Sequence, residues 1–239
     1  MKHLSADVLV CGGGISGLLT SKALVNLGLH VVCVEKRKEE FSTIGQESDG
    51  RSTALLAPSI KFINELGIWS SLSKKAQALE SLIICNLNSE KGLIDQTCEF
   101  FANDLGLECL GYNIPNDLLR SEIKNSLTAE KNFLFLDNVA IENLIPRTKE
   151  IIALTNKKQK ISVKLVIGAD GKNSTLRQLA KIRTFGFEYR QQALVFSMQH
   201  ELNHEAKSFE IYQSGGPCTL VPLKTASNNG YFSSVVLME

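Results

Sequence analysis

The feature that most constrains this chain is a glycine string at residues 12–17, Gly-Gly-Gly-Ile-Ser-Gly. The run before it, residues 8–11, is apolar and rich in β-branched side chains, which is typical of a strand buried on both faces. Residues 15–27 have a helical pattern, and residues 30–34 form a second short apolar run that ends at Glu35. Strand, glycine turn, helix and strand together predict one βαβ unit of about thirty residues.

The glycine string matches the pattern G-x-G-x-x-G, in which each glycine has its own task. Gly12 allows the tight turn out of the strand, Gly14 has no Cβ to keep a pyrophosphate from the helix N-terminus, and Gly17 lets helix and strand pack closely. Glu35 lies 18 residues beyond Gly17, where an acid accepts hydrogen bonds from a ribose 2′-hydroxyl and repels a 2′-phosphate. The pattern predicts bound FAD or NAD rather than NADP, and by itself does not separate the first two.

Apolar periodicity predicts an α/β protein over the rest of the chain. The helix at 15–27 is expected to turn Leu18, Leu19, Ala23, Leu24 and Leu27 to the core and to end at Gly28. Two more helices are expected, at 58–66 with Ile60, Ile63 and Leu66 facing the core, and from Asn116 with Leu119, Ile123 and Leu127 spaced i, i+4, i+8. Strands are expected within 78–114, at 133–136, in a hairpin of 151–154 with 161–167, and at 193–198, 209–212, 218–223 and 231–237.

Composition and charge give no reason to expect several classes of function. The 26 basic and 25 acidic side chains leave a net charge of +1, which favours neither nucleic acid nor an anionic membrane as a partner. No apolar run approaches the ~20 residues of a membrane helix. The hydrophobic run that follows the first seven residues is too short for a signal peptide, so a cytoplasmic location is expected. His200 and His204 lie four residues apart without a convincing helical pattern around them, and no metal site is expected.

Two later segments resemble the flavoprotein aromatic hydroxylases, in particular the ubiquinone-biosynthesis hydroxylases. Residues 49–55, Asp-Gly-Arg-Ser-Thr-Ala-Leu, are similar to the family's D-x-R-x-x-A-L segment, and residues 168–177 are similar to its G-A-D-G-x-x-S-x-x-R segment. Residues 215–223 add a stretch similar to the family's G-P-x-x-x-L-P-L. The resemblance runs through essentially the whole chain in the family's order and favours FAD over NAD.

The resemblance implies a Rossmann-type FAD-binding domain at 1–77 and 111–183, and a mainly antiparallel β-sheet substrate domain at 78–110 and 184–239. It implies that Arg51 lies over the flavin-side phosphates, and that the Asp170 segment approaches the pyrophosphate and is linked to NAD(P)H use. Asn116 stands where relatives often carry a glutamine near the flavin, and a simple helix N-cap explains it equally well. The predicted cofactor-binding residues are Gly12, Gly14, Ile15, Ser16, Gly17, Glu35, Lys36, Arg51, Asn116, Val139 (an adenine contact through its backbone), Ala169, Asp170 and Gly171.

The implied activity is an FAD-dependent monooxygenation in ubiquinone biosynthesis, in which a prenylated phenol-like ring is hydroxylated with NAD(P)H and O2. The cofactor performs the difficult step, so no catalytic residue is assigned. The implied partner is a small aromatic substrate, and peripheral association with the inner membrane or a biosynthetic complex stays open. Relatives carry a third flavin segment, G-D-A-A-H, beyond the position of Glu239. The alternative is therefore a truncated, non-catalytic FAD-binding remnant or complex subunit.

Overall fold

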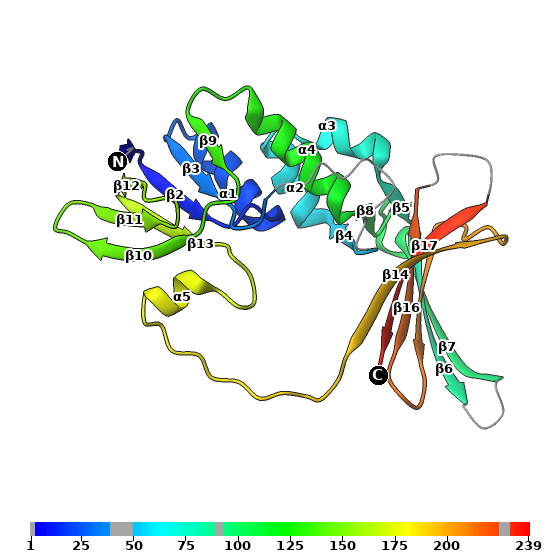
Figure 1. Cartoon of the computed structure of the whole chain (residues 1–239). Helices are drawn as coiled ribbons and strands as arrows, with labels where there is room; N and C mark the ends of the chain where they lie inside the picture. Colours follow the sequence, from blue (N-terminus) through cyan, green and yellow to red (C-terminus); the bar gives the residue numbers. More distant parts are fainter. Residues whose placement is uncertain (1–2, 39–49, 89–92, 225–229) are drawn as a thin grey trace. The chain divides into compact units, whose positions relative to one another are not determined.

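A computed structural model describes residues 3–38, 50–88, 93–224 and 230–239 (Figure 1). Asp49, which opens the family-like segment at 49–55, lies outside these residues. The chain forms two compact units, one of Met1–Phe41 with Arg120–Gly186 and one of Ser42–Leu119 with Phe187–Glu239. The domain division predicted from the resemblance stays a prediction, and each unit is described by itself below.

In its described residues, the first unit holds two sheets and three helices. Its elements are β1 (His3–Ser5), β2 (Val8–Cys11), α1 (Ile15–Asn26), β3 (Val31–Val34), most of α4 (Asn116–Thr128), β9 (Phe133–Leu136), β10 (Ile141–Pro146), β11 (Ile151–Thr155), β12 (Lys160–Val163), β13 (Leu165–Gly168) and α5 (Thr175–Leu179). One sheet is entirely parallel, in the order β13-β2-β3-β9, and the other has the order β1-β12-β11-β10.

The parallel sheet explains the apolar runs that flank the glycine string. Every residue of β2 and β3 is buried, as the unbroken Val-Leu-Val-Cys and Val-Val-Cys-Val runs predict. Leu9 and Val32 on this sheet share one core with Ala153 and Ile161 on the neighbouring sheet. The carboxyl ends of β2, β3 and β13 are aligned in register, so the segments that follow them meet at one edge of the sheet.

Helix α1 buries only part of the predicted face, since Leu18 is buried while Leu19, Ala23 and Leu24 are only partly buried. Gly17, Leu18 and Val25 are buried, whereas Leu27, predicted to face the core, is 77% exposed. The reason lies at Gly17, where a Cβ would stand 1.9 Å from the carbonyl oxygen of Gly12. This close backbone approach sets the buried face of the helix, and leucine spacing does not.

The apolar run predicted as one strand at 161–167 is two strands in different sheets. β12 pairs antiparallel with β11, which confirms the hairpin, while β13 runs parallel to β2. Lys164 lies between them, where its backbone N–H donates to the Asp7 carbonyl at 3.0 Å and its ammonium binds the Asp7 carboxylate at 2.8 Å. The run looks continuous in sequence because both strands are apolar.

The second unit is built mainly from antiparallel strands, as the family resemblance implies. Its elements are β4 (Ser52–Leu56), α2 (Ala57–Glu65), α3 (Trp69–Leu72), η1 (Ser73–Lys75), β5 (Gln77–Leu79), β6 (Ser81–Asn88), β7 (Leu93–Phe101), η2 (Ala102–Leu105), β8 (Gly111–Pro115), β14 (Ala193–His200), β15 (Lys207–Tyr212), β16 (Cys218–Leu223) and β17 (Tyr231–Met238). A six-stranded sheet has the order β14-β17-β16-β15-β6-β7, and only its β15–β6 pair is parallel. A small sheet has the order β4-β8-β5.

The predicted elements of this part are largely confirmed. Strands stand at all four places expected after residue 184. In α2, Ile63 and Leu66 are buried as expected while Ile60 is half-buried, and Gly67, at φ +77°, follows the helix. None of the helices that the structure describes combines the length and apolar composition that crossing a membrane requires.

Candidate functional site

The loop after β2 is a tight turn that only glycine permits at its first position. Gly12 has φ +115°, and a Cβ there would stand 2.2 Å from the carbonyl oxygen of Ala169. The Ala169 N–H donates to the Cys11 carbonyl at 2.7 Å, and the Gly12 N–H donates to the Val34 carbonyl at 2.8 Å. The loop is therefore held between the ends of β3 and β13.

The N-terminus of α1 leaves backbone N–H groups without partners inside the helix. Gly14 is the N-cap residue; among the described residues no side chain caps this end, and the first turn contains no acid. The first helical bond runs from the Leu18 N–H to the Gly14 carbonyl at 2.9 Å, so the N–H groups of Ile15, Ser16 and Gly17 have no partner within the helix. Such N–H groups and the positive end of the helix dipole together favour a phosphate.

Gly14 differs from the other glycines of the loop in what surrounds it. A Cβ on Gly12, Gly13 or Gly17 would stand within 3.0 Å of protein atoms, whereas a Cβ on Gly14 would meet no described atom within 4 Å. The protein itself thus explains the absence of a side chain at three of the four positions. At Gly14 the space is open for a ligand.

Glu35 lies at the carboxyl end of β3, and its carboxylate is directed at the loop. One oxygen accepts from the Gly13 N–H at 2.8 Å, and the other accepts from the Arg37 N–H at 3.0 Å. The Glu35 backbone joins the neighbouring segment, because its N–H donates to Leu136 and its carbonyl accepts from Val139, both at 2.9 Å. A carboxylate has about four acceptor positions, so the two described bonds do not use its full capacity.

Two other predicted residues flank Glu35. Val139, which follows β9 in the chain, is buried at 3% exposure. Its N–H donates to the Glu35 carbonyl, so the two residues are neighbours. Lys36 follows Glu35 and is exposed. The predicted residues of the first unit therefore gather at the carboxyl edge of the parallel sheet, where open α/β sheets bind ligands.

The Asp170 side chain accepts hydrogen bonds from residues of the turn in which it lies. Its carboxylate accepts from the Ser174 hydroxyl at 2.5 Å and from the Leu176 N–H at 3.0 Å, which closes the loop into α5. Burial alone would raise the pKa of Asp170, but these hydrogen bonds together outweigh it and hold the pKa below its usual range. Gly171 follows with φ +83°. The ionised carboxylate therefore stabilises the turn that leads into α5, a structural role that the motif alone does not reveal.

Arg51 and Asn116 belong to the second unit, where they are neighbours. The Asn116 N–H donates to the Arg51 carbonyl at 3.0 Å, and the Thr53 hydroxyl donates to the Asn116 side-chain oxygen at 2.6 Å. The pairing of β4 with β8 brings them together, since Ser52 lies opposite Pro115. The Asn116 side chain thus links the start of α4 to β4.

Sequence reasoning missed one residue that contacts the glycine loop. The Arg120 Nε–H donates to the Gly13 carbonyl at 2.7 Å, across 107 positions of sequence. No motif contains either residue as a required letter. The available signal was the helical pattern from Asn116, which predicts that Arg120 lies one turn into a helix.

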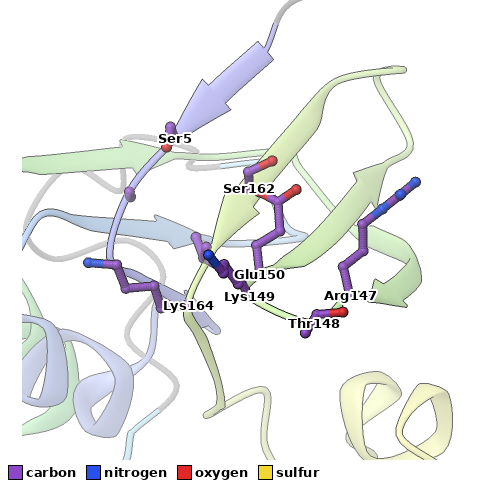
Figure 2. A pocket seen from close by; sticks show the side chains of 9 residues that line it. Ser5, Arg147, Thr148, Lys149, Glu150, Ser162 and Lys164 are labelled. Atoms are coloured by element: carbon purple, nitrogen blue, oxygen red, sulfur yellow. The ribbon is translucent and has the colours of Figure 1, made fainter.

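A cavity of about 450 Å³ lies elsewhere in the first unit. Its lining includes residues 5–6 and 162–164, which precede β2 and β13, together with the turn at 147–150. It is therefore at the amino ends of these strands, opposite the glycine loop. Figure 2 shows that Arg147 and Lys164, two of the charged residues that line the cavity, point in different directions.

Comparison with known proteins assigns this architecture. A family model described as an FAD binding domain matches residues 5–239. Ubiquinone hydroxylase UbiL of Rhodospirillum rubrum is 28% identical over 220 residues, which cover 91% of this chain and 49% of that protein. The 3-demethoxyubiquinol 3-hydroxylase of Escherichia coli is 27% identical over 225 residues, which cover 93% of this chain and 56% of that protein. The chain thus spans about half the length of these curated relatives.

Solved structures show the same fold at low identity. The p-nitrophenol 4-monooxygenase PnpA of Pseudomonas putida matches with a TM-score of 0.81 at 17% identity, over 100% of this chain and 58% of that one. PqsL of P. aeruginosa in complex with 2-aminobenzoylacetate matches with a TM-score of 0.79 at 20% identity, over 98% of this chain and 60% of that one.

Proposed function

The chain belongs to the FAD binding domain family, and from that premise we propose that it serves an NAD(P)H- and O2-dependent hydroxylation of an aromatic ring. The proposed substrate is a prenylated phenol-like compound of ubiquinone biosynthesis. Curated relatives from a bacterium and a mammal support this choice, since their names describe ubiquinone hydroxylation or biosynthesis. Peripheral association with a membrane or a biosynthetic complex would suit so apolar a substrate.

The observation that carries the proposal is the open space at Gly14 beside an uncapped helix end. Protein atoms account for the other glycines of the loop, while a Cβ on Gly14 would meet no described atom within 4 Å. The first turn of α1 contains no acid, so no side chain of that turn repels a phosphate. The Glu35 carboxylate is anchored to the same loop by the Gly13 N–H. This combination fits the pyrophosphate and ribose of a dinucleotide.

In this proposal the predicted residues near the glycine loop bind the pyrophosphate and adenosine part of FAD. The N–H groups of Ile15 and Ser16 bind the pyrophosphate, and Glu35 accepts hydrogen bonds from the adenosine ribose. Val139 contacts adenine through its backbone, and Lys36 lies beside the ribose.

The remaining tasks fall to segments further along the chain. Arg51 offers a guanidinium to the flavin-side phosphates, and Asn116 lies near the flavin. Ala169, Asp170 and Gly171 approach the pyrophosphate from the end of β13. Bound FAD would supply the redox chemistry, with NAD(P)H as the transient reductant.

The test is spectroscopic and kinetic. We expect the purified chain to bind FAD, with the yellow flavin absorbance retained after gel filtration, and to oxidise NAD(P)H faster when a phenolic substrate is added. Glu35→Ala is expected to weaken FAD binding, with Glu150→Ala, at the distant cavity, as the matched control. A chain that does not bind FAD would contradict the proposal. FAD binding without oxygen-dependent turnover would instead favour a non-catalytic FAD-binding subunit.

A further inference from the structure

The middle glycine of the loop, Gly13, is held from two sides. Its N–H donates to a carboxylate oxygen of Glu35 at 2.8 Å, and its carbonyl accepts from the Arg120 Nε–H at 2.7 Å. The second bond is at the short end of the range for N–H···O bonds, and its donor is charged. The G-x-G-x-x-G pattern leaves this position open to any residue, so neither contact follows from the motif.

Space around Gly13 is also filled. A Cβ there would stand 2.9 Å from ring atoms of Phe135 and 3.0 Å from the Cβ of Glu35. The loop therefore rests on β9 as well as on β3. The two peptide groups of Gly13 cannot rotate freely, because both polar groups and the Cα are in contact with fixed neighbours.

The helix that carries Arg120 is itself firmly attached within the first unit. Ile123 and Leu127 of α4 have no exposed surface. The ammonium of the buried Lys22, on α1, donates to the Ser126 carbonyl at 3.3 Å and binds the Glu130 carboxylate at 2.5 Å. Arg120 thus extends from a fixed base to the loop that begins α1.

We propose that Arg120 is a positioning residue of the dinucleotide site, an inference that rests on the proposed binding of FAD. The carbonyl of Gly13 and the N–H of Gly14 belong to one planar trans peptide and point in opposite directions. By holding the Gly13 carbonyl, Arg120 fixes the direction of the Gly14 N–H at the N-terminus of α1. Glu35 fixes the preceding peptide in the same way, so two consecutive peptide planes are set before the ligand arrives.

Pre-organisation of this kind raises affinity, because the loop does not have to be ordered when the ligand binds. Substitutions at Arg120 distinguish the effect of its hydrogen bond on FAD affinity from the effect of its positive charge. Arg120→Gln keeps an N–H donor at the same number of bonds from Cα as the arginine Nε. Arg120→Met ends in a methyl group at the place of the arginine Nε, without a donor. Lys131→Met, at an exposed position after α4, removes one positive charge as the control.

The Kd for FAD is measured by quenching of flavin fluorescence, and amide hydrogen exchange of residues 12–18 is measured without FAD. We expect Arg120→Met to raise the Kd roughly tenfold to a hundredfold and to speed exchange in the loop. Arg120→Gln is expected to retain most of the affinity and the protection, and Lys131→Met to change neither. Arg120→Ala replaces Arg120→Met if that variant does not fold.

Two results would overturn the inference while the FAD site stands. One is an Arg120→Met protein with unaltered Kd and loop exchange. The other is an equal loss in Arg120→Gln and Arg120→Met with a reduced salt dependence of the Kd, which would assign the effect to charge. Failure of the unaltered chain to bind FAD would overturn both this inference and the proposed function.

Discussion

Gly14 and Gly17 lack side chains for different physical reasons. At Gly17 the reason is internal to the protein, since a Cβ would stand 1.9 Å from the Gly12 carbonyl oxygen. At Gly14 the protein leaves the space open, and the reason is the proposed ligand. The two positions therefore separate folding from binding.

Alanine at each position should give opposite results. Gly17→Ala is expected to lower the free energy of unfolding by about 1–3 kcal/mol, because backbone atoms have to move apart. Gly14→Ala is expected to change the stability of the FAD-free protein by less than about 1 kcal/mol and to raise the Kd for FAD at least about tenfold. Urea unfolding and flavin titration check the pair. A Gly14→Ala protein with normal FAD affinity would contradict the assignment.

Because the pKa of Asp170 is lowered by folding, we expect its contribution to the free energy of unfolding to depend on pH. Burial by itself would raise its pKa, but the hydrogen bonds of the turn, which include those from the Ser174 hydroxyl and the Leu176 N–H, together hold the pKa in the folded protein below the usual value. Stability from a lowered pKa is complete above the unfolded pKa of about 3.9 and is lost as the pH falls through the folded pKa. Asp170→Asn cannot accept both bonds in the same way.

We expect Asp170→Asn to lower the Tm by roughly 2–4 °C at pH 7, and the difference from the unaltered protein to shrink as the pH is lowered to about 3. Thermal unfolding followed by circular dichroism at both pH values measures this. A difference that is the same at both pH values would mean that the ionised carboxylate is not responsible.

At the scale of elements, the sequence predicted where helices and strands lie better than which faces they bury. The strands on both sides of the glycine string and the four strands after residue 184 stand where the apolar runs place them, because these runs are local. The buried face of α1 was wrong at Leu27, and the run at 161–167 divides at Lys164. For α1 the close approach of the Gly17 Cα to the Gly12 backbone decided, and for the run at 161–167 a partner far away in sequence, Asp7, decided.

The connection between α1 and α4 gives a prediction at this scale. Lys22 is buried, and its ammonium binds the Glu130 carboxylate and the Ser126 carbonyl. Glu130→Gln is expected to lower the free energy of unfolding by about 1–3 kcal/mol. In a Lys22→Met background the same change should cost much less, since no buried charge remains to be left unpaired. A double-mutant cycle by urea unfolding measures the coupling, and purely additive effects would contradict it.

For the whole molecule, the two compact units imply that unfolding need not be a single transition. A ligand stabilises the part that binds it, by about 2.7 kcal/mol at a concentration one hundred times its Kd. FAD should therefore raise the unfolding temperature of the first unit.

Hydrogen exchange locates this effect. We expect FAD to slow amide exchange at residues 12–18, at Glu35 and Val139, and at 169–171. The turn at 147–150, which lines the cavity at the opposite end of the parallel strands, serves as the internal control and should exchange at an unaltered rate. Protection spread evenly over both regions would contradict the proposed location of the cofactor.

The amino-acid sequence alone determined the βαβ unit, the glycine loop, the acid at Glu35 and the resemblance to the hydroxylase family. These features are encoded by neighbouring residues, so their pattern is legible along the chain. The tertiary structure decided the buried face of α1, the bonds of Asp170 within its turn and the contact of Arg120 with Gly13. That contact joins residues 107 positions apart. Such partners meet only when α4 packs beside the loop, and their pairing leaves no period or spacing in the sequence.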